Sequence, residues 1–195
     1  GSYINIIRDA LGDTVKNELG IFNIAQTTGV EPIKIAEPTK TEFTPNEVAK
    51  DLVWKYFYNN KPLKLTHSDD SGCYYQPSKD LVNMVEPESF TDSDSYYKTL
   101  FHEMSHSTGH QDRLNRATLT GHNPFGSEEY SKEELVAEIT SMYLTGLTGI
   151  TPKDSNANSQ AYINGWITFA KNDKNNVIVH AMTQASKSAD YILQY

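Results

Sequence analysis

One stretch of the sequence, Tyr96–Arg116, constrains the fold more than any other. It reads YYKTLFHEMSHSTGHQDRLNR and carries His102, His106 and His110, three of the six histidines. On a helical wheel with about 100° per residue, one apolar sector holds Tyr97, Leu100, Phe101 and Met104. His102 and His106 fall on the opposite side of the helix. The stretch therefore predicts an amphipathic helix with a separate histidine face.

The spacing of the first two histidines is that of a metal site. Imidazoles at positions i and i+4 lie one above the other, as two neighbouring corners of a tetrahedral zinc site require. Glu103 follows the first histidine, so its carboxylate can reach a metal-bound water. The H-E-x-x-H pattern combines two ligands with a general base. We predict His102 and His106 as ligands and Glu103 as the base; His110 lies about 12 Å along the helix from His102, too far to share the ion.

A third ligand has to come from elsewhere, and three residues are candidates. Asp112 completes the pattern H-E-x-x-H-x-x-G-x-x-D, in which Gly109 turns the chain back toward the metal. Glu134 and Glu138 lie on a later predicted helix, at one edge of its predicted buried face, and Glu133 is expected to point away. That face is expected to comprise Leu135, Ile139, Met142 and Tyr143. We prefer Glu134 as the ligand. Glu138 is then its outer partner, or the ligand in its place, and Asp112 is a further alternative ligand.

Strands are predicted early in the chain and helices later, which favours an α+β fold. The predicted strands cover residues 20–30, 61–67, 73–76 and 80–85. The predicted helices cover residues 44–58, 92–106, 127–147, 160–170 and 174–193. Thr44 is expected to cap the first of these helices, with Pro45 and Glu47 in its first turn. We expect Trp54 and Trp166, which lie in helical apolar patterns, to be buried.

Composition narrows the class of protein. A chain of 195 residues with 37% hydrophobic residues fits a single domain, 1–195. Gly1-Ser2 resembles a remnant of an expression vector, so we expect the chain to be a piece of a longer protein. The net charge of −8 argues against nucleic acid as a partner. The single cysteine excludes an internal disulfide and fits a reducing compartment. No apolar run is long enough for a membrane span, and no signal peptide is recognisable, so we expect a cytoplasmic protein.

Several blocks of the sequence resemble a known family. FHEMSHSTGHQDRLNR, FGSEEYSKEELVAEI and AYINGWI, with IFNIAQTTGV and YYQPSKDLVNMVEPESF upstream, are similar to the metallopeptidase-like domain of ArdC-type antirestriction proteins. The same zincin-like domain occurs in TraC-type primases and phage polyvalent proteins. The resemblance implies a zincin-like α+β fold, in which a small mixed sheet packs on the H-E-x-x-H helix and further helices follow. It also implies His102, His106 and a downstream glutamate as ligands, with Glu103 as base. Ser107 departs from the aromatic residue often found there.

These observations lead to two functional hypotheses. The first is a gluzincin-like zinc metallopeptidase domain of a mobile-element protein, using zinc or another divalent metal such as manganese to cleave a peptide or protein substrate. Residues 80–85 either pair with an extended substrate or form an ordinary strand inside the sheet. The oxyanion donor is one of Tyr130, His122, Arg113 and His180. Arg113 and Arg116 are otherwise expected to form structural ion pairs. The second hypothesis is a non-catalytic, metal-stabilised module that binds a host restriction or defence protein.

Overall fold

The computed structural model describes residues 2–8, 14–20, 42–68, 72–121, 127–151 and 176–194. The chain separates into two compact units, residues 1–38 and 39–195, and each is described by itself. In the first, strands β1 (Ser2–Arg8) and β2 (Thr14–Gly20) form an antiparallel hairpin to which the sequence analysis assigned no element. Residues 21–30, where a strand was predicted, lie outside the described part. That all 195 residues form one domain stays a prediction.

The second unit contains a small mixed sheet with the strand order β3-β5-β4. Strand β3 (Lys64–His67) is parallel to β5 (Leu81–Met84), and β4 (Tyr74–Gln76) is antiparallel to it. Short 3₁₀ turns follow β4 at Pro77–Lys79 and β5 at Pro87–Ser89. All three strands were predicted. Of the two alternatives for residues 80–85, ordinary sheet pairing is correct, because β5 is the central strand and offers no free edge to substrate. Strands β4 and β3 are the outer strands among those described.

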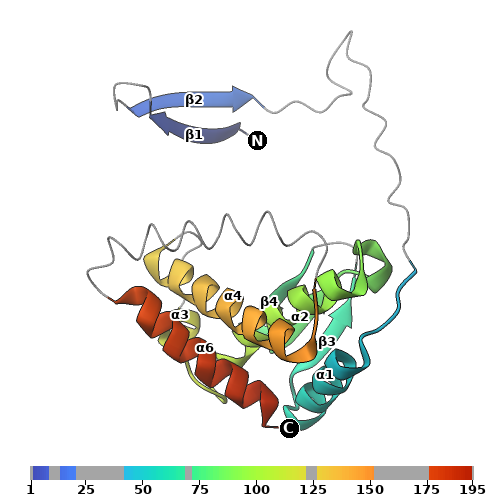
Figure 1. The fold of residues 1–195 in the computed structure, drawn as a ribbon. Helices are drawn as coiled ribbons and strands as arrows, with labels where there is room; N and C mark the ends of the chain where they lie inside the picture. Colours follow the sequence, from blue (N-terminus) through green and yellow to red (C-terminus); the bar gives the residue numbers. More distant parts are fainter. Residues whose placement is uncertain are drawn as a thin grey trace. The chain divides into compact units, whose positions relative to one another are not determined.

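Helix α2 (Ser93–Thr108) carries the histidines and packs against the sheet (Figure 1). Asp92 caps it by accepting a hydrogen bond from the backbone N–H of Ser95 at 2.7 Å, and Gly109 ends it. The predicted apolar sector is confirmed, since all four of its side chains are at least 96% buried. They are Tyr97, Leu100, Phe101 and Met104. Together with Val82 and Met84 of β5, they form the centre of the main core.

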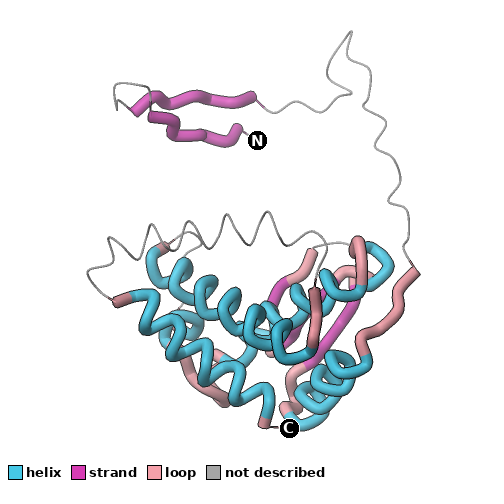
Figure 2. The backbone as a smooth tube through the Cα atoms, viewed as in Figure 1, coloured by secondary structure: helices cyan, strands magenta, loops and turns pink. Residues whose placement is uncertain are grey.

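Two long helices complete the layer beyond α2. Helix α4 (Glu128–Thr148) lies against α2, and α6 (Val177–Leu193) packs on both (Figures 1 and 2). Ser127 caps α4, and Gly149 ends it in the left-handed conformation at φ 69°, which glycine adopts without a steric penalty. A short helix, α3 (Ala117–Thr120), precedes α4. The predicted helices 92–106, 127–147 and 174–193 are confirmed as α2, α4 and α6. The predicted helix 160–170, including Trp166, lies outside the described part.

The buried face of α4 differs from the prediction. Met142 and Tyr143 are each 38% exposed, whereas Val136 and Thr140 are almost fully buried. The reason is that α4 contacts α2 along one side and α6 along another, so its buried surface is wider than one apolar sector. Leu135, Val136 and Ile139 form a second core cluster with Ala181 and Ala185 of α6.

The start of helix α1 (Glu47–Asn59) also differs from the prediction. Asn46 is its cap, because its side-chain oxygen accepts the backbone N–H of Ala49 at 3.0 Å. The Asn46 amide also donates to the carbonyl of Thr148 at the end of α4, at 3.3 Å. Trp54 is 60% exposed and stacks on Tyr58 with ring centroids 4.9 Å apart, so its predicted burial is wrong. Within the described ranges, no helix combines the length and apolar composition that crossing a bilayer requires.

Candidate metal centre

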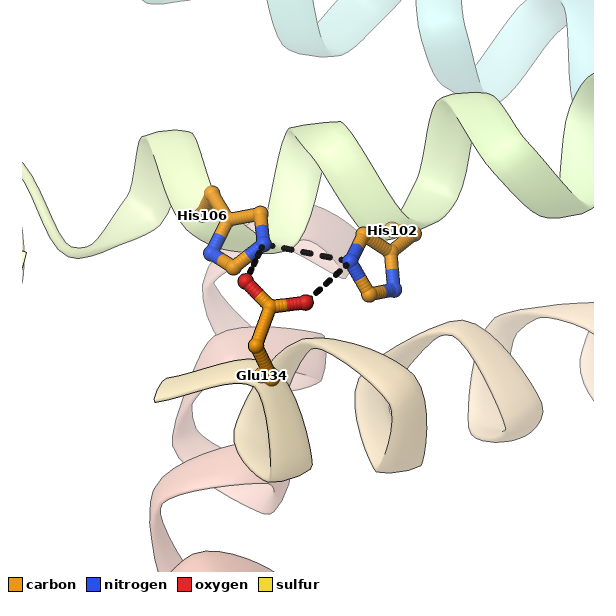
Figure 3. Close-up of side chains that lie close together, drawn as sticks. All are labelled: His102, His106 and Glu134. Carbon is orange, nitrogen blue, oxygen red and sulfur yellow. Dashed lines mark hydrogen bonds and ion pairs between the residues drawn. The ribbon is translucent and has the colours of Figure 1, made fainter. Parts of the chain in front are cut away.

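Three side chains from two helices converge at the open face of α2. His102 and His106 point from α2 toward Glu134 of α4 (Figure 3). The two Nε2 atoms are 3.1 Å apart. Glu134 places Oε2 at 3.4 Å from Nε2 of His102 and Oε1 at 3.4 Å from Nε2 of His106. Each residue offers one ligand atom within 4.8 Å of the others, and among the described residues no other group of this kind is found.

These separations fit the coordination shell of one divalent ion. Two atoms that bind one ion at about 2.0–2.2 Å lie about 3.3–3.6 Å apart at a tetrahedral angle and about 3 Å apart at a right angle. The observed 3.1–3.4 Å falls in this range. Two imidazoles and a carboxylate are also a donor set that zinc accepts in catalytic sites. The arrangement can therefore hold a metal with three protein ligands and leave a position open.

Each imidazole has a second carboxylate behind it. Nδ1 of His102 lies 3.4 Å from Oε2 of Glu138, and Nδ1 of His106 lies 3.3 Å from Oε1 of Glu133. Such contacts hold the proton on Nδ1 and turn the Nε2 lone pair toward the metal position. Glu138 therefore lies behind the candidate ligand His102, where an outer partner is expected. Its carboxylate also lies 3.6 Å from the ammonium of Lys98.

The position of Glu133 contradicts the prediction that it points away. Its side chain is 4% exposed and lies behind His106. Arg116 donates from Nε to Oε2 of Glu133 at 3.0 Å, and Thr118 donates to the same oxygen at 2.6 Å. The predicted ion-pair role of Arg116 is confirmed. Glu133 could have been found from the stripe that it shares with Val136, Ala137 and Thr140, which indicates a second buried face of α4.

The charges around the centre compensate one another when no metal is present. Burial disfavours a charged His106, but hydrogen bonds to Glu133 and Glu134 outweigh this and raise its pKa. The pKa of His102 is also raised, because contacts with Glu134 and Glu138 outweigh burial. Despite burial, hydrogen bonds from His106 and Arg116 lower the pKa of Glu133 to about 2. A metal ion at this position would take the place of the imidazole protons.

Glu103 occupies the wall of a cleft beside these residues. The cleft has a volume of about 450 Å³ and is bounded by β4 and its flanking residues, α2, α3 and α4. Glu103 is 8% exposed and accepts a hydrogen bond from the backbone N–H of Tyr75 in β4. Burial raises its pKa. Tyr130 also lines this cleft and hydrogen-bonds to Glu134.

The other sequence candidates lie away from the centre. Asp112 is 74% exposed in its side chain, and its carboxylate lies 3.6 Å from Nδ1 of His110 rather than beside the ligand pair. Arg113 is bound to Asp80, which confirms its expected ion pair, and His180 is exposed on α6. His122 lies outside the described residues. Of the three possible oxyanion donors that the structure describes, Tyr130 is the one that lines the cleft.

The chain is similar to proteins of known family. A family model described as a zincin-like metallopeptidase matches residues 54–184. A DNA primase TraC of Escherichia coli is 35% identical over 175 residues, which cover 90% of this chain and 11% of that protein. The chain thus spans about a ninth of the length of this relative.

Solved structures agree with this assignment. The Mn(II)-bound crystal structure of the antirestriction protein ArdC from the R388 plasmid is 28% identical, with a TM-score of 0.57, and the match covers 98% of this chain and 67% of that one. The metal-free ArdC structure is 29% identical, with a TM-score of 0.55 and coverage of 98% and 66%. The α+β architecture described above is therefore the zincin-like fold of ArdC.

Proposed function

The chain belongs to the zincin-like metallopeptidase family, and on this premise we propose that it is a zinc-dependent peptidase domain. The observation that carries the proposal is the convergence of His102, His106 and Glu134 on one point, beside the buried carboxylate of Glu103. A non-catalytic site is usually closed by four protein ligands, whereas this group offers three and faces a cleft. The proposed reaction is hydrolysis of a peptide bond.

The three converging residues would hold the metal, for which zinc is the first choice and manganese the alternative. One ArdC structure is described as Mn(II)-bound, which supports a divalent ion in this family. Such an ion supplies Lewis acidity, which polarises a peptide carbonyl and makes a bound water more acidic. Glu138 and Glu133 keep the ligand imidazoles in the orientation and tautomer that the ion needs.

Glu103 is the proposed general base. It takes a proton from the attacking water and returns it to the nitrogen of the leaving amine. Its raised pKa suits both steps, because a carboxylate of normal acidity is a weak base. The hydrogen bond from the Tyr75 N–H fixes the orientation of the carboxylate.

Tyr130 is the proposed donor to the oxyanion that develops on the substrate carbonyl. It lies one helical turn before Glu134 on α4 and lines the cleft together with Glu103. A phenol hydroxyl can stabilise negative charge at the carbonyl oxygen without giving up its proton. Its present partner, Glu134, would share this hydroxyl with the substrate.

The outer strand of the cleft wall, β4, is the proposed binding edge for an extended peptide. Its inner side is paired with β5, and Cys73, Tyr74, Tyr75 and Pro77 line the cleft. Extended peptides add to such edges through backbone hydrogen bonds. The substrate is a protein or peptide, and the similarity to antirestriction proteins suggests a host restriction or defence protein as the target.

The test is cleavage of denatured, fluorescein-labelled casein by the zinc-loaded chain and by the Glu103→Gln variant. We expect cleavage by the wild type, a loss of about 10²–10⁴-fold in the variant, and equal metal content in both. Metal bound in both proteins without Glu103-dependent cleavage would contradict the peptidase. That result would instead favour the metal-stabilised module that binds a host protein.

A further inference from the structure

Tyr75, the middle residue of β4, is held at both of its ends. Its backbone N–H donates to the carboxylate of Glu103, and its hydroxyl donates to Oδ1 of Asp80 at 2.8 Å. The first contact reaches the helix that carries the metal ligands. The second reaches the residue that leads into β5. A three-residue strand paired on one side is short for a stable edge, so these contacts decide where β4 lies.

Asp80 is in turn bound by Arg113, which ties it to the end of α2. Arg113 donates from Nη1 to Oδ2 of Asp80 at 3.0 Å and from Nη2 to the Tyr75 hydroxyl at 3.2 Å. Its Nε donates to the carbonyl of Ser107 at 2.6 Å, next to the ligand His106. The side chains of Arg113 and Asp80 are 5% and 11% exposed. A paired guanidinium and carboxylate fix direction as well as distance.

The backbone of Asp80 is held in one conformation by the turn around it. It adopts the left-handed conformation at φ 45° and ψ 60°, which is unusual for a residue with a Cβ atom. Its N–H is bonded to Pro77 and its carbonyl to Lys64, so the turn holds this conformation in place. Strained positions persist where the surrounding structure over-determines them, often beside functional sites.

We propose that Tyr75, Asp80 and Arg113 form a latch that positions β4 against α2 for catalysis. The latch rests on the proposed peptidase function and deepens it. It keeps the Tyr75 N–H in its hydrogen bond to Glu103. It also fixes the distance between the outer edge of β4 and the metal ligands, so that a peptide bound along β4 lies where it can react. All three are positioning residues, because none of them needs to touch the reacting atoms. Misplacement by about 1 Å costs about 10²-fold in rate.

Cys73 provides a readout of the latch that needs no activity. It is the single cysteine, it directly precedes β4, and it is half-buried with its thiol bonded to the Val85 N–H. Tyr75→Phe and Asp80→Asn should each raise the rate of its reaction with 5,5′-dithiobis(2-nitrobenzoate) about tenfold, as expected for loss of a hydrogen bond to a charged group. Asparagine also tolerates the left-handed backbone, so Asp80→Asn tests the charge.

Tyr56→Phe is the matched control. The Tyr56 hydroxyl bonds to Oγ of Ser107 at 2.8 Å, so its hydrogen bond reaches the same end of α2 and not β4. Ser107 keeps its hydrogen bond to the Met104 carbonyl in this variant. We expect wild-type thiol reactivity in Tyr56→Phe. Equal rates in Tyr75→Phe, Tyr56→Phe and the wild type would overturn the latch.

A second arm separates binding along β4 from binding to the metal. With zinc-loaded protein, calorimetry compares a tripeptide hydroxamate, which extends along the cleft, with acetohydroxamate, which reaches the metal alone. Tyr75→Phe and Asp80→Asn should weaken the tripeptide hydroxamate and leave acetohydroxamate unchanged, while Tyr56→Phe alters neither. If both compounds weaken equally, the residues support the fold in general and the latch is wrong. If the wild type binds both compounds equally, β4 does not bind an extended peptide, and the proposed peptide substrate is wrong. The rates of thiol reaction then test the latch by themselves.

Discussion

Arg116 and Glu133 form a salt bridge that lies directly behind His106, a candidate metal ligand. Their side chains are 3% and 4% exposed, and the same carboxylate contacts Nδ1 of His106. Arg116 also donates to the hydroxyl of Thr108 and the carbonyl of Ser105, so α2, the loop after it and α4 meet at one guanidinium. The candidate metal centre thus has a buried ionic support on its inner side.

Replacing Arg116 by methionine should destabilise the fold and the metal site together. Glu133 would lose its guanidinium and keep only His106 and the Thr118 hydroxyl as partners, so the cost should approach that of a broken buried ion pair, about 3–5 kcal/mol. Zinc affinity should fall about 10–100-fold, because His106 loses its fixed partner. Urea unfolding with EDTA measures the first effect and zinc titration the second. Lys55→Met, which removes an exposed pair with Asp51, should leave both unchanged.

The choice of third ligand can be tested with two alanine variants. Glu134→Ala should weaken zinc binding by more than about 100-fold, beyond the effect of losing an outer partner. Asp112→Ala should leave it unchanged, because that side chain is exposed and faces His110. Metal analysis after gel filtration distinguishes the variants. Loss of metal in Asp112→Ala alone would exclude Glu134 as the ligand.

The metal-free protein should be most stable in a mildly acidic window. The pKa of His106 is raised in the folded state, so its contribution is fully present below the unfolded value near 6.5 and disappears as the pH rises through the folded pKa. The pKa of Glu133 and that of Glu134 are lowered, so their contributions are present above about 4.5 and disappear at lower pH. With EDTA, we expect the highest Tm between about pH 4.5 and 6.5.

Zinc should move this optimum to higher pH, since the ion replaces the imidazole protons and competes with them in acid. Thermal denaturation between pH 4 and 10, with and without zinc, measures the shift. An optimum that does not move with zinc would argue against His102 and His106 as ligands.

Tyr130→Phe should lower kcat about 10²-fold and leave KM and zinc content nearly unchanged, because the hydroxyl acts on the transition state. Tyr143→Phe is the control, since Tyr143 lies on the same helix and is partly exposed outside the residues that line the cleft. Steady-state kinetics on the casein substrate provide the measurement. If zinc content falls enough to explain the lower rate, Tyr130 positions the ligand Glu134 and does not act as the oxyanion donor.

Local patterns predicted the parts of this structure that depend on a single element. The apolar face of α2 and its histidine face follow from periodicity, and so does the extent of α4, predicted over residues 127–147. The position of Glu133 does not, because α4 is buried on two sides by helices distant in sequence. The same limit applies to β5: its residues predict a strand, but not that strands on both sides would occupy its edges.

The cap of α1 shows the same limit at a smaller scale. Thr44 and Asn46 are both acceptable caps by sequence. Asn46 also bonds to the Thr148 carbonyl, more than 100 residues away, and no local pattern contains that contact. Trp54 is exposed for a related reason, since helical spacing indicates which residues share a face but not which face is covered.

The buried pair of Arg116 and Glu133 also affects the entropy of assembling the site. The contact between His106 and Glu133 joins residues 27 positions apart, and the contact between Arg116 and Glu133 joins residues 17 positions apart within that segment. Closing a chain segment costs entropy that grows slowly with its length. Because the ion pair closes most of this segment during folding, an arriving ion meets ligands that are already gathered. Its binding energy therefore goes into affinity rather than into ordering the chain.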